Sequence, residues 1–308
     1  MILVTGATGT VGSEVVRQLV AVGQRPRVFV RDPARAQRRF GEQAEYVAGD
    51  LDRPETLEAG LAGVDRVFLI TTQSTRQLDW EGYVIGAAAR AGVGHVVKVS
   101  VFRADENSPL QIARQHGQAE QALERSGLAY TIVRPVFFMQ NLLGMVRNCA
   151  IYTAAGDGRV AMVDARDVAA VAVASLTSRG HEGSIYTLTG PEALSFDDVA
   201  ETLSGQTGGQ IRHVRVPPDA VGHALEQTGV ESWFAEDMAK LHRMLAGGYE
   251  DVVTDDAGTV TGSRPRTLSR FARDHSTVFT GPRSACRRSP SRMLEARAGR
   301  AASSQGRP

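Results

Sequence analysis

The sequence predicts a doubly wound parallel α/β sheet with a smaller C-terminal α/β cap region. Short apolar runs alternate with helical patterns six times over residues 1–135, as in a parallel sheet covered by helices on both faces. The chain opens on a strand, a glycine-rich turn and a helix. After residue 135 the elements become shorter, so we expect a cap region over residues 136–279, interleaved with the first domain.

The opening turn carries the clearest functional motif. Three glycines, Gly6, Gly9 and Gly12, separate the apolar residues 1–4 from a helix pattern. In such a turn the first glycine allows a tight bend, the second lets the backbone approach a pyrophosphate, and the third lets helix and strand pack closely. Phosphates bind at the helix N-terminus, where N–H groups favour negative charge. We predict a dinucleotide site here; the alternative is a tight turn without a ligand.

The end of the second strand selects between two dinucleotides. This strand covers residues 27–30, and Arg31 and Asp32 follow it. An acidic residue at this place binds the 2′-hydroxyl of NAD, whereas an arginine accommodates the 2′-phosphate of NADP. Because Arg31 comes first, NADP(H) is the preferred cofactor and NAD(H) the alternative. Asp32 could instead cap the helix predicted over residues 33–40.

Strands three and four also end in polar residues. The third, residues 44–48, leads to Asp50, which could accept a hydrogen bond from an adenine amino group or simply close a turn. The fourth, residues 65–70, is followed by Thr71 and Thr72. Ligands of open parallel sheets bind beyond the carboxyl ends of the strands, so these hydroxyls are candidate contacts of the cofactor ribose.

The last two strands of the first domain border the expected reaction site. An alanine-rich helix over residues 77–91 precedes strand five, residues 95–99, which ends at Ser100. A long helix over residues 110–126 then leads to strand six, residues 129–133. Large side chains follow that strand and suit the wall of an apolar substrate pocket, although plain core explains each one at least as well: Phe137, Phe138 and Met139.

The remaining elements are expected to build the cap, chiefly over residues 159–262. They include a strand over residues 183–189 and a helix over residues 195–203 with Ser195 as its N-cap. A last helix is predicted over residues 264–279.

Charge is distributed unevenly along the chain. Residues 281–308 contain seven arginines and one glutamate without hydrophobic periodicity, which predicts a disordered basic tail over residues 280–308. The rest of the chain carries 28 basic and 33 acidic groups. A mildly acidic body does not support a nucleic-acid-binding surface.

Neither a metal site nor a membrane segment is predicted. Cys149 and Cys286 lack the spacing of metal ligands. No stretch is long and apolar enough to span a bilayer, and the opening apolar run is too short for a signal peptide. We expect a cytoplasmic protein, monomer or homodimer, that acts on a small-molecule substrate.

One common reductase chemistry can be excluded directly. The main branch of short-chain dehydrogenases uses a tyrosine and a lysine four residues later. The lysines here are Lys98 and Lys240, and Gly94 and Glu236 stand four residues before them. The Tyr/Lys pair is therefore absent.

Several motifs together resemble the NmrA-like group of atypical short-chain dehydrogenases. They are the glycine pattern, Arg31, Gly49-Asp50, residues 126–135 (SGLAYTIVRP), 138–141 (FMQN), 164–169 (DARDVA) and 186–191 (YTLTGP). This group includes triphenylmethane reductases, type 2 quinone oxidoreductases, isoflavone reductase relatives and a non-enzymatic redox-sensing regulator. The similarity covers residues 1–279.

The resemblance implies an NAD(P)-binding Rossmann domain over residues 1–135 and a set of site residues. Those expected at the cofactor are Gly6, Thr8, Gly9, Thr10, Val11, Gly12, Arg31, Asp50, Leu51, Thr71 and Thr72. Those expected at the substrate are Phe137, Phe138, Met139 and Asn141. Isoflavone reductase relatives have a catalytic lysine in the helix before strand six, and His116 stands at that position here.

His116 is the candidate proton donor, with Ser100 as a second catalytic candidate. An imidazole titrates near neutral pH, so it can protonate a developing alkoxide or phenolate while hydride arrives from the nicotinamide. Glu120, one turn further on the same helix face, could orient the ring or raise its pKa. The alternatives are a surface histidine and a turn serine. Arg134 and Asp167 are expected to form a structural polar network.

Two functions fit these observations. An NADPH-dependent reductase of an apolar, aromatic or quinone-like acceptor fits the cofactor motif and the aromatic wall. A non-catalytic NAD(P) sensor that regulates a protein partner fits the absent Tyr/Lys pair and the replaced lysine. We favour the enzyme.

Overall fold

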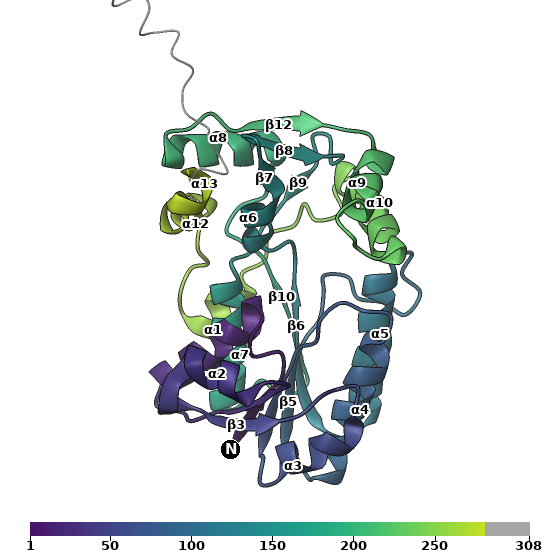
Figure 1. Ribbon diagram of the computed structural model, residues 1–308, viewed down its shortest axis with the longest axis vertical. Helices are drawn as coiled ribbons and strands as arrows, with labels where there is room; N and C mark the ends of the chain where they lie inside the picture. Colours follow the sequence, from purple (N-terminus) through teal and green to yellow (C-terminus); the bar gives the residue numbers. More distant parts are fainter. Residues whose placement is uncertain (281–308) are drawn as a thin grey trace, which may run out of the picture.

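A parallel sheet of seven strands forms the centre of the protein in a computed structural model, which describes residues 1–280 (Figure 1). The strands are β1 (Ile2–Val4), β2 (Arg27–Val30), β3 (Glu45–Ala48), β4 (Arg66–Leu69), β5 (His95–Val99), β6 (Ala129–Pro135) and β10 (Ser184–Leu188). Their order is β10-β6-β5-β4-β1-β2-β3. The doubly wound parallel sheet is thereby confirmed.

The order of the strands in the sheet determines where a ligand can bind. The chain runs outward from β1 to β3 and then crosses to β4 on the other side of β1. A crevice opens at such a switch point, beyond the carboxyl ends of β1 and β4. Every side chain of β1 and of β5 is buried, as expected for strands covered by helices on both faces.

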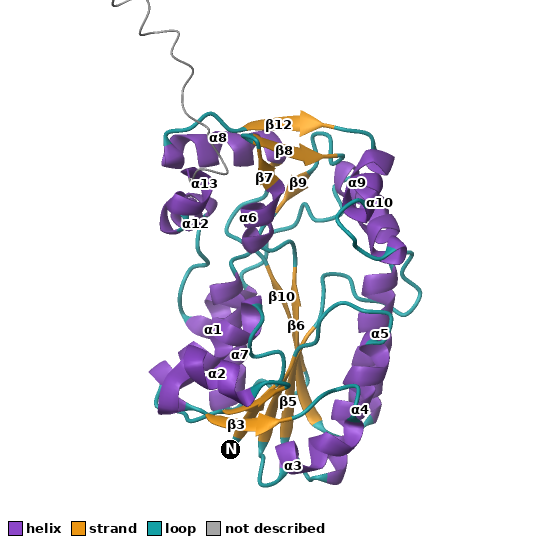
Figure 2. Ribbon diagram, in the orientation of Figure 1, coloured by secondary structure: helices purple, strands orange, loops and turns teal. Residues whose placement is uncertain are grey.

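Helices cover both faces of the sheet (Figure 2). The larger core, around Val15, Val168 and Val30, packs one layer against it. This layer contains α1 (Thr10–Ala21), α2 (Pro33–Phe40), α7 (Ala165–Thr177) and α11 (Asp256–Thr261). The core around Leu57 and Val84 packs the other layer. That layer contains α3 (Leu57–Leu61), α4 (Gln77–Arg90) and α5 (Gln111–Arg125), with the short 3-10 helix Pro54–Thr56 directly before α3. A second 3-10 helix, Gly41–Gln43, follows α2 and leads to β3.

One strand lies in a different sheet from the one expected. Residues 183–189 are predicted in the cap, but β10 pairs in parallel with β6, from Ser184 opposite Thr131 to Leu188 opposite Pro135. The preceding helix α7 packs against α1 in the main layers. The chain therefore returns from the cap to the main sheet, which a strand pattern by itself does not reveal.

The cap gathers at one end of the molecule, beyond the carboxyl ends of β6 and β10 (Figure 1). Its strands are β7 (Val146–Arg147), β8 (Ala150–Thr153) and β12 (Arg212–Arg215) in one sheet, and β9 (Arg159–Val160) with β11 (Leu194–Ser195) in another. Its helices are the 3-10 helix Met139–Asn141, α6 (Leu142–Met145), α8 (Phe196–Thr207), α9 (Pro218–Glu226), α10 (Ser232–Ala246), α12 (Leu268–Asp274) and α13 (Ser276–Thr280).

Two local predictions in the cap have different outcomes. Ser195 caps α8 as predicted: its hydroxyl accepts from the Asp198 N–H while the Asp198 carboxylate accepts from the Ser195 N–H. The single helix predicted over residues 264–279 is wrong, because α12 starts after its N-cap Thr267 and ends at Asp274, and α13 begins at Ser276 after the C-cap His275. The predicted basic tail lies, from residue 281 on, outside the described residues.

Candidate functional site

The glycine turn is a closely packed piece of backbone. Gly6 has a φ of +55°, and a Cβ atom there would lie 2.7 Å from Ile70 Cγ2. A Cβ atom on Gly12 would lie 2.2 Å from the Gly6 carbonyl oxygen. No side chain among residues 1–280 caps α1 at Gly9, so the first N–H groups of this helix remain open to an anion. These residues fit a dinucleotide pyrophosphate, with the exposed Thr8 and Thr10 on either side.

The end of β2 has only one side chain left to bind a ligand. Asp32 Oδ1 accepts a hydrogen bond of 2.9 Å from the Arg35 N–H and caps α2, so its predicted alternative role as an N-cap is confirmed. Arg31 is exposed, and its side chain has no partner among residues 1–280. Arg39 donates to the Thr8 carbonyl at 2.6 Å and ties α2 to the glycine turn.

The loop after β3 contains Asp50, which the sequence predicts beside the adenine. Asp50 Oδ1 accepts from the Asp52 N–H at 3.1 Å, so this carboxylate does close a turn. The Asp52 carboxylate pairs with Arg76 and accepts from Trp80 Nε1 at 2.7 Å. Leu51, which lies between Asp50 and Asp52 in the sequence, is partly buried against the core around Leu57 and Val84. Asp52, Arg76 and Trp80 are absent from the sequence-based site, because no local pattern joins residues this far apart.

His116 is buried rather than exposed on a helix surface. Its side chain is only 7% exposed, and Nδ1 lies 2.9 Å from Lys98 Nζ. An ammonium group can only donate, so Nδ1 is the acceptor and the ring proton sits on Nε2. Burial, with the Lys98 charge, holds the pKa of His116 well below its ordinary value. The prediction that Glu120 raises this pKa is therefore wrong.

Nε2 of His116 faces Gln77. The two side-chain nitrogens are 2.9 Å apart, and two N–H donors cannot bond to each other. The amide oxygen of Gln77 is buried without a partner in the described part of the chain. Turning the amide over would let it accept the Nε2 proton, at the cost of the 3.3 Å bond that the amide nitrogen donates to Glu81 Oε1.

A fully buried ion pair supports this histidine. Lys98 Nζ and Glu81 Oε2 are 3.0 Å apart, and both side chains are 0% exposed. Glu81 Oε1 also accepts from the Thr71 hydroxyl at 2.9 Å. The pair therefore links a predicted cofactor residue to His116. The sequence-based site omits both Lys98 and Glu81, although a lysine inside the apolar strand HVVKV is itself an unusual signal.

The Glu120 carboxylate binds Ser100 and Arg134 rather than the His116 ring. Ser100 donates to Glu120 Oε1, and Arg134 donates to both oxygens of that carboxylate. The carboxylate raises the pKa of the Arg134 guanidinium. Asp167 belongs to a separate cluster, in which it pairs with Arg266. Arg134 and Asp167 thus each stand in a polar network, but not in the same one.

The residues after β6 divide between core and surface. Met139 is 2% exposed within the core of the cap, which corrects its assignment to a pocket wall. Phe137 and Phe138 are only partly buried and pack against different cores, and Asn141 is exposed. The Phe137 N–H bonds to the buried carboxyl of Glu250, whose pKa burial raises to about 7.

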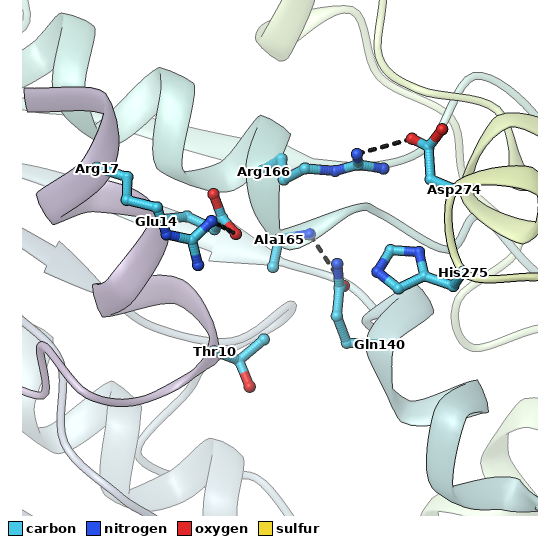
Figure 3. A pocket seen from close by; sticks show the side chains of 8 residues that line it. All are labelled: Thr10, Glu14, Arg17, Gln140, Ala165, Arg166, Asp274 and His275. Carbon is cyan, nitrogen blue, oxygen red and sulfur yellow. Dashed lines mark hydrogen bonds and ion pairs between the residues drawn. The ribbon is translucent and has the colours of Figure 1, made fainter. Parts of the chain in front are cut away.

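A cavity of about 280 Å³ opens beside Thr10, between α1, the start of α7 and α12 (Figure 3). Charged side chains line it, but they pair with one another: Arg17 with Glu14 at 2.6 Å, and Arg166 with Asp274 at 2.8 Å. Such a lining does not suit an apolar acceptor. The cavity extends from the glycine turn and is not the predicted substrate wall.

Comparison with known proteins identifies the family of this chain. A sequence profile described as NAD(P)H-binding matches residues 6–179. This chain belongs to that NAD(P)H-binding family. The NAD(P)H azoreductase of Xenophilus azovorans is 40% identical to it over 283 residues, 91% of this chain and 99% of the azoreductase. Quinone oxidoreductase 2 of Escherichia coli is 31% identical over 286 residues, again 91% and 99%. The protein is an NAD(P)H-dependent oxidoreductase.

Solved structures confirm the predicted resemblance. An Escherichia coli NADPH-dependent quinone oxidoreductase complexed with NADPH has a TM-score of 0.80 at 28% identity, covering 88% of this chain and 98% of that one. A Citrobacter triphenylmethane reductase with NADP(H) has a TM-score of 0.77 at 28% identity, covering 89% and 99%. The negative transcriptional regulator NmrA, at 18% identity with a TM-score of 0.74 over 89% and 94%, shares the fold. Along residues 1–280, no helix is long and apolar enough to cross a membrane.

Proposed function

We propose that this protein is an NADPH-dependent reductase that passes hydride to a small apolar acceptor of aromatic or quinone-like character. The observation that carries the cofactor preference is the contrast at the end of β2. Asp32 is engaged as a helix cap, whereas Arg31 is exposed and unpaired within the described residues. An unpaired guanidinium suits a 2′-phosphate, which NADPH has and NADH lacks.

Two observations support an aromatic or quinone-like acceptor: the aromatic side chains that follow β6, and the names of the relatives. The half-buried rings of Phe137 and Phe138 suit a flat apolar molecule. The relatives' names describe reductases of azo compounds, quinones and triphenylmethane dyes, which are all conjugated aromatic or quinonoid molecules. The sensor alternative has only the fold shared with NmrA in its favour.

When bound, the nicotinamide would supply the hydride, and the residues of this chain would hold the reactants and move the proton. Gly6, Gly9 and Gly12 would hold the pyrophosphate, and Thr71 would contact the nicotinamide side. We propose that His116 acts as a neutral relay: once the Gln77 side chain has moved aside for the acceptor, Nε2 gives its proton to the acceptor while Nδ1 takes one from Lys98. Ser100, held by Glu120, would orient the acceptor.

Cofactor titrations test the proposal first. For Arg31→Ala we expect the Kd for NADPH to rise about tenfold, because one charge-assisted contact with the 2′-phosphate is lost. The Kd for NADH should stay within about twofold of wild type. Gly9→Asp should abolish binding of both. The wild-type protein should also oxidise NADPH with 1,4-naphthoquinone or an azo dye. Equal Kd changes for both dinucleotides would refute the role of Arg31, and absence of turnover across a broad quinone, azo and dye panel would refute the acceptor class.

A further inference from the structure

We propose that Arg103 binds an anionic group of the acceptor, so that the preferred acceptors are conjugated molecules bearing a sulfonate or carboxylate. This inference rests on the proposed function, because it specifies the acceptor of the same site. Four observations support it: the place of Arg103, the packing of its side chain, its lack of a counter-ion and its backbone conformation.

Arg103 stands beside the expected reaction centre. It lies three residues after Ser100, in the loop that leaves the carboxyl end of β5. The N–H of the neighbouring Phe102 donates to the Pro135 carbonyl at 3.0 Å, which ties this loop to the end of β6. The wall begins at that point with Phe137. A group bound at Arg103 would therefore extend from a ring held against this wall.

The guanidinium lies against two aromatic rings that are in contact with each other. Its Cζ lies 5.1 Å from the ring centre of Phe102 and 4.9 Å from that of Tyr249. The two rings also contact each other edge to face, with centres 5.8 Å apart. A cation–π contact holds a guanidinium in place but leaves N–H groups along its edge able to donate. An oxyanion meets such an edge with two parallel hydrogen bonds.

Arg103 has no counter-ion in the part of the chain that the structure describes. The residue is exposed, and no carboxylate there pairs with it. The nearest acidic residue in the loop, Asp105, instead accepts from the Asn107 N–H at 2.7 Å. A positive charge that is fixed in place and unpaired loses little conformational freedom when an anion binds.

The backbone of Arg103 is strained. Its φ of +51° lies in the left-handed region, which costs energy for any residue with a Cβ atom. Within residues 1–280 the other non-glycine residues with positive φ are Asn148 and Cys149. These two form the turn between β7 and β8, where two-residue hairpins favour positive φ. At Arg103 the Ala104 N–H donates to the Val101 carbonyl at 3.2 Å, and a β-turn of this kind can require a positive φ at its third residue, so this turn fixes where the side chain leaves the loop.

The test compares two acceptors that differ in one anionic group. Steady-state rates with NADPH are measured for 1,2-naphthoquinone and for 1,2-naphthoquinone-4-sulfonate. We expect Arg103→Gln to raise the KM for the sulfonated quinone about tenfold and to leave the KM for the neutral quinone within about twofold, since one charge-assisted contact is removed. Arg103→Lys keeps the charge without the paired N–H edge and should fall between. Arg90→Gln, which removes an exposed arginine at the end of α4, is the matched control.

A binding experiment distinguishes failure of this inference from failure of the proposed function. Calorimetric titration of naphthalene-2-sulfonate and of 2-naphthol into the NADP⁺-bound protein needs no turnover. Weaker binding of the sulfonate alone in Arg103→Gln supports the inference even if neither quinone is reduced, a result that would refute only the acceptor class. Equal losses for charged and neutral ligands would mean that Arg103 only joins the loop to Tyr249. Unchanged affinities would mean that it does not touch the ligand, and either result overturns the inference.

Discussion

At the scale of the residue, His116 shows how burial decides chemistry. The Lys98 ammonium leaves Nδ1 only the role of acceptor, and burial keeps the ring neutral near pH 7 because it lowers the pKa. The sequence places Glu120 one turn from His116 and so predicts the opposite shift. Helix spacing brings two residues to one face, but each then bonds to whatever the neighbouring strand presents.

The tautomer and the role of His116 can both be measured. In ¹⁵N spectra of the imidazoles we expect His116, assigned by its loss in His116→Gln, to show the Nε2–H form and to stay neutral as the pH falls through 6.5. His116→Gln should lower kcat about 100-fold, as loss of a proton-transfer group does, with the Kd for NADPH unchanged. Titration near pH 6.5, or an Nδ1–H signal, would contradict the proposed relay.

Glu250 is the residue whose ionisation should couple to stability. It is buried, one of its oxygens has no partner within residues 1–280, and burial raises its pKa from 4.5 to about 7. The folded protein therefore holds this proton more tightly than the unfolded chain. The stabilisation is complete below pH 4.5 and disappears as the pH rises through 7, a change of about 3 kcal/mol.

Glu250→Gln removes this titration but keeps an acceptor for the Phe137 N–H. In urea unfolding between pH 4.5 and 8, the free energy of unfolding of wild type minus that of the variant should fall by about 3 kcal/mol, mostly below pH 7. Groups common to both proteins cancel in this difference. A difference that does not vary with pH would show that Glu250 titrates as an ordinary exposed carboxyl.

At the scale of the element, the contact between β1 and α1 depends on Gly12. A Cβ atom there would meet the backbone of Gly6 at 2.2 Å, and backbone cannot move aside as a side chain can. We expect Gly12→Ala to lower the free energy of unfolding by about 3 kcal/mol, at the upper end of overpacking costs, and to weaken NADPH binding.

A second helical glycine provides the control. Gly82 lies within α4, where a Cβ atom would meet nothing within 4 Å. Gly82→Ala should therefore raise stability by about 0.5–1 kcal/mol, the difference in helix propensity. Chemical denaturation of both variants gives the comparison. Similar stability of Gly12→Ala and wild type would mean that the turn can relax, and that Gly12 is not required for packing.

At the scale of the whole molecule, the site is assembled from segments that the fold brings together. The loop after β5 meets the cap where Arg103 stacks on Tyr249. The start of α5 meets α10 where the Ile112 N–H donates to the buried carboxylate of Asp237 at 2.8 Å. These contacts hold the cap over the carboxyl ends of the strands, and the return of β10 to the main sheet fastens the cap from its other end.

The sequence by itself determined the type and chain order of the elements from β1 to β6, the glycine turn and the N-caps Asp32 and Ser195. These features depend on neighbours within a few residues, so local periodicity and capping patterns reveal them. Tertiary structure decided which sheet β10 joins, which partner Glu120 takes and how deeply His116 is buried. Those outcomes depend on pairs far apart in the chain, such as Lys98 with His116 and Arg103 with Tyr249, which meet only after the sheet and cap have packed.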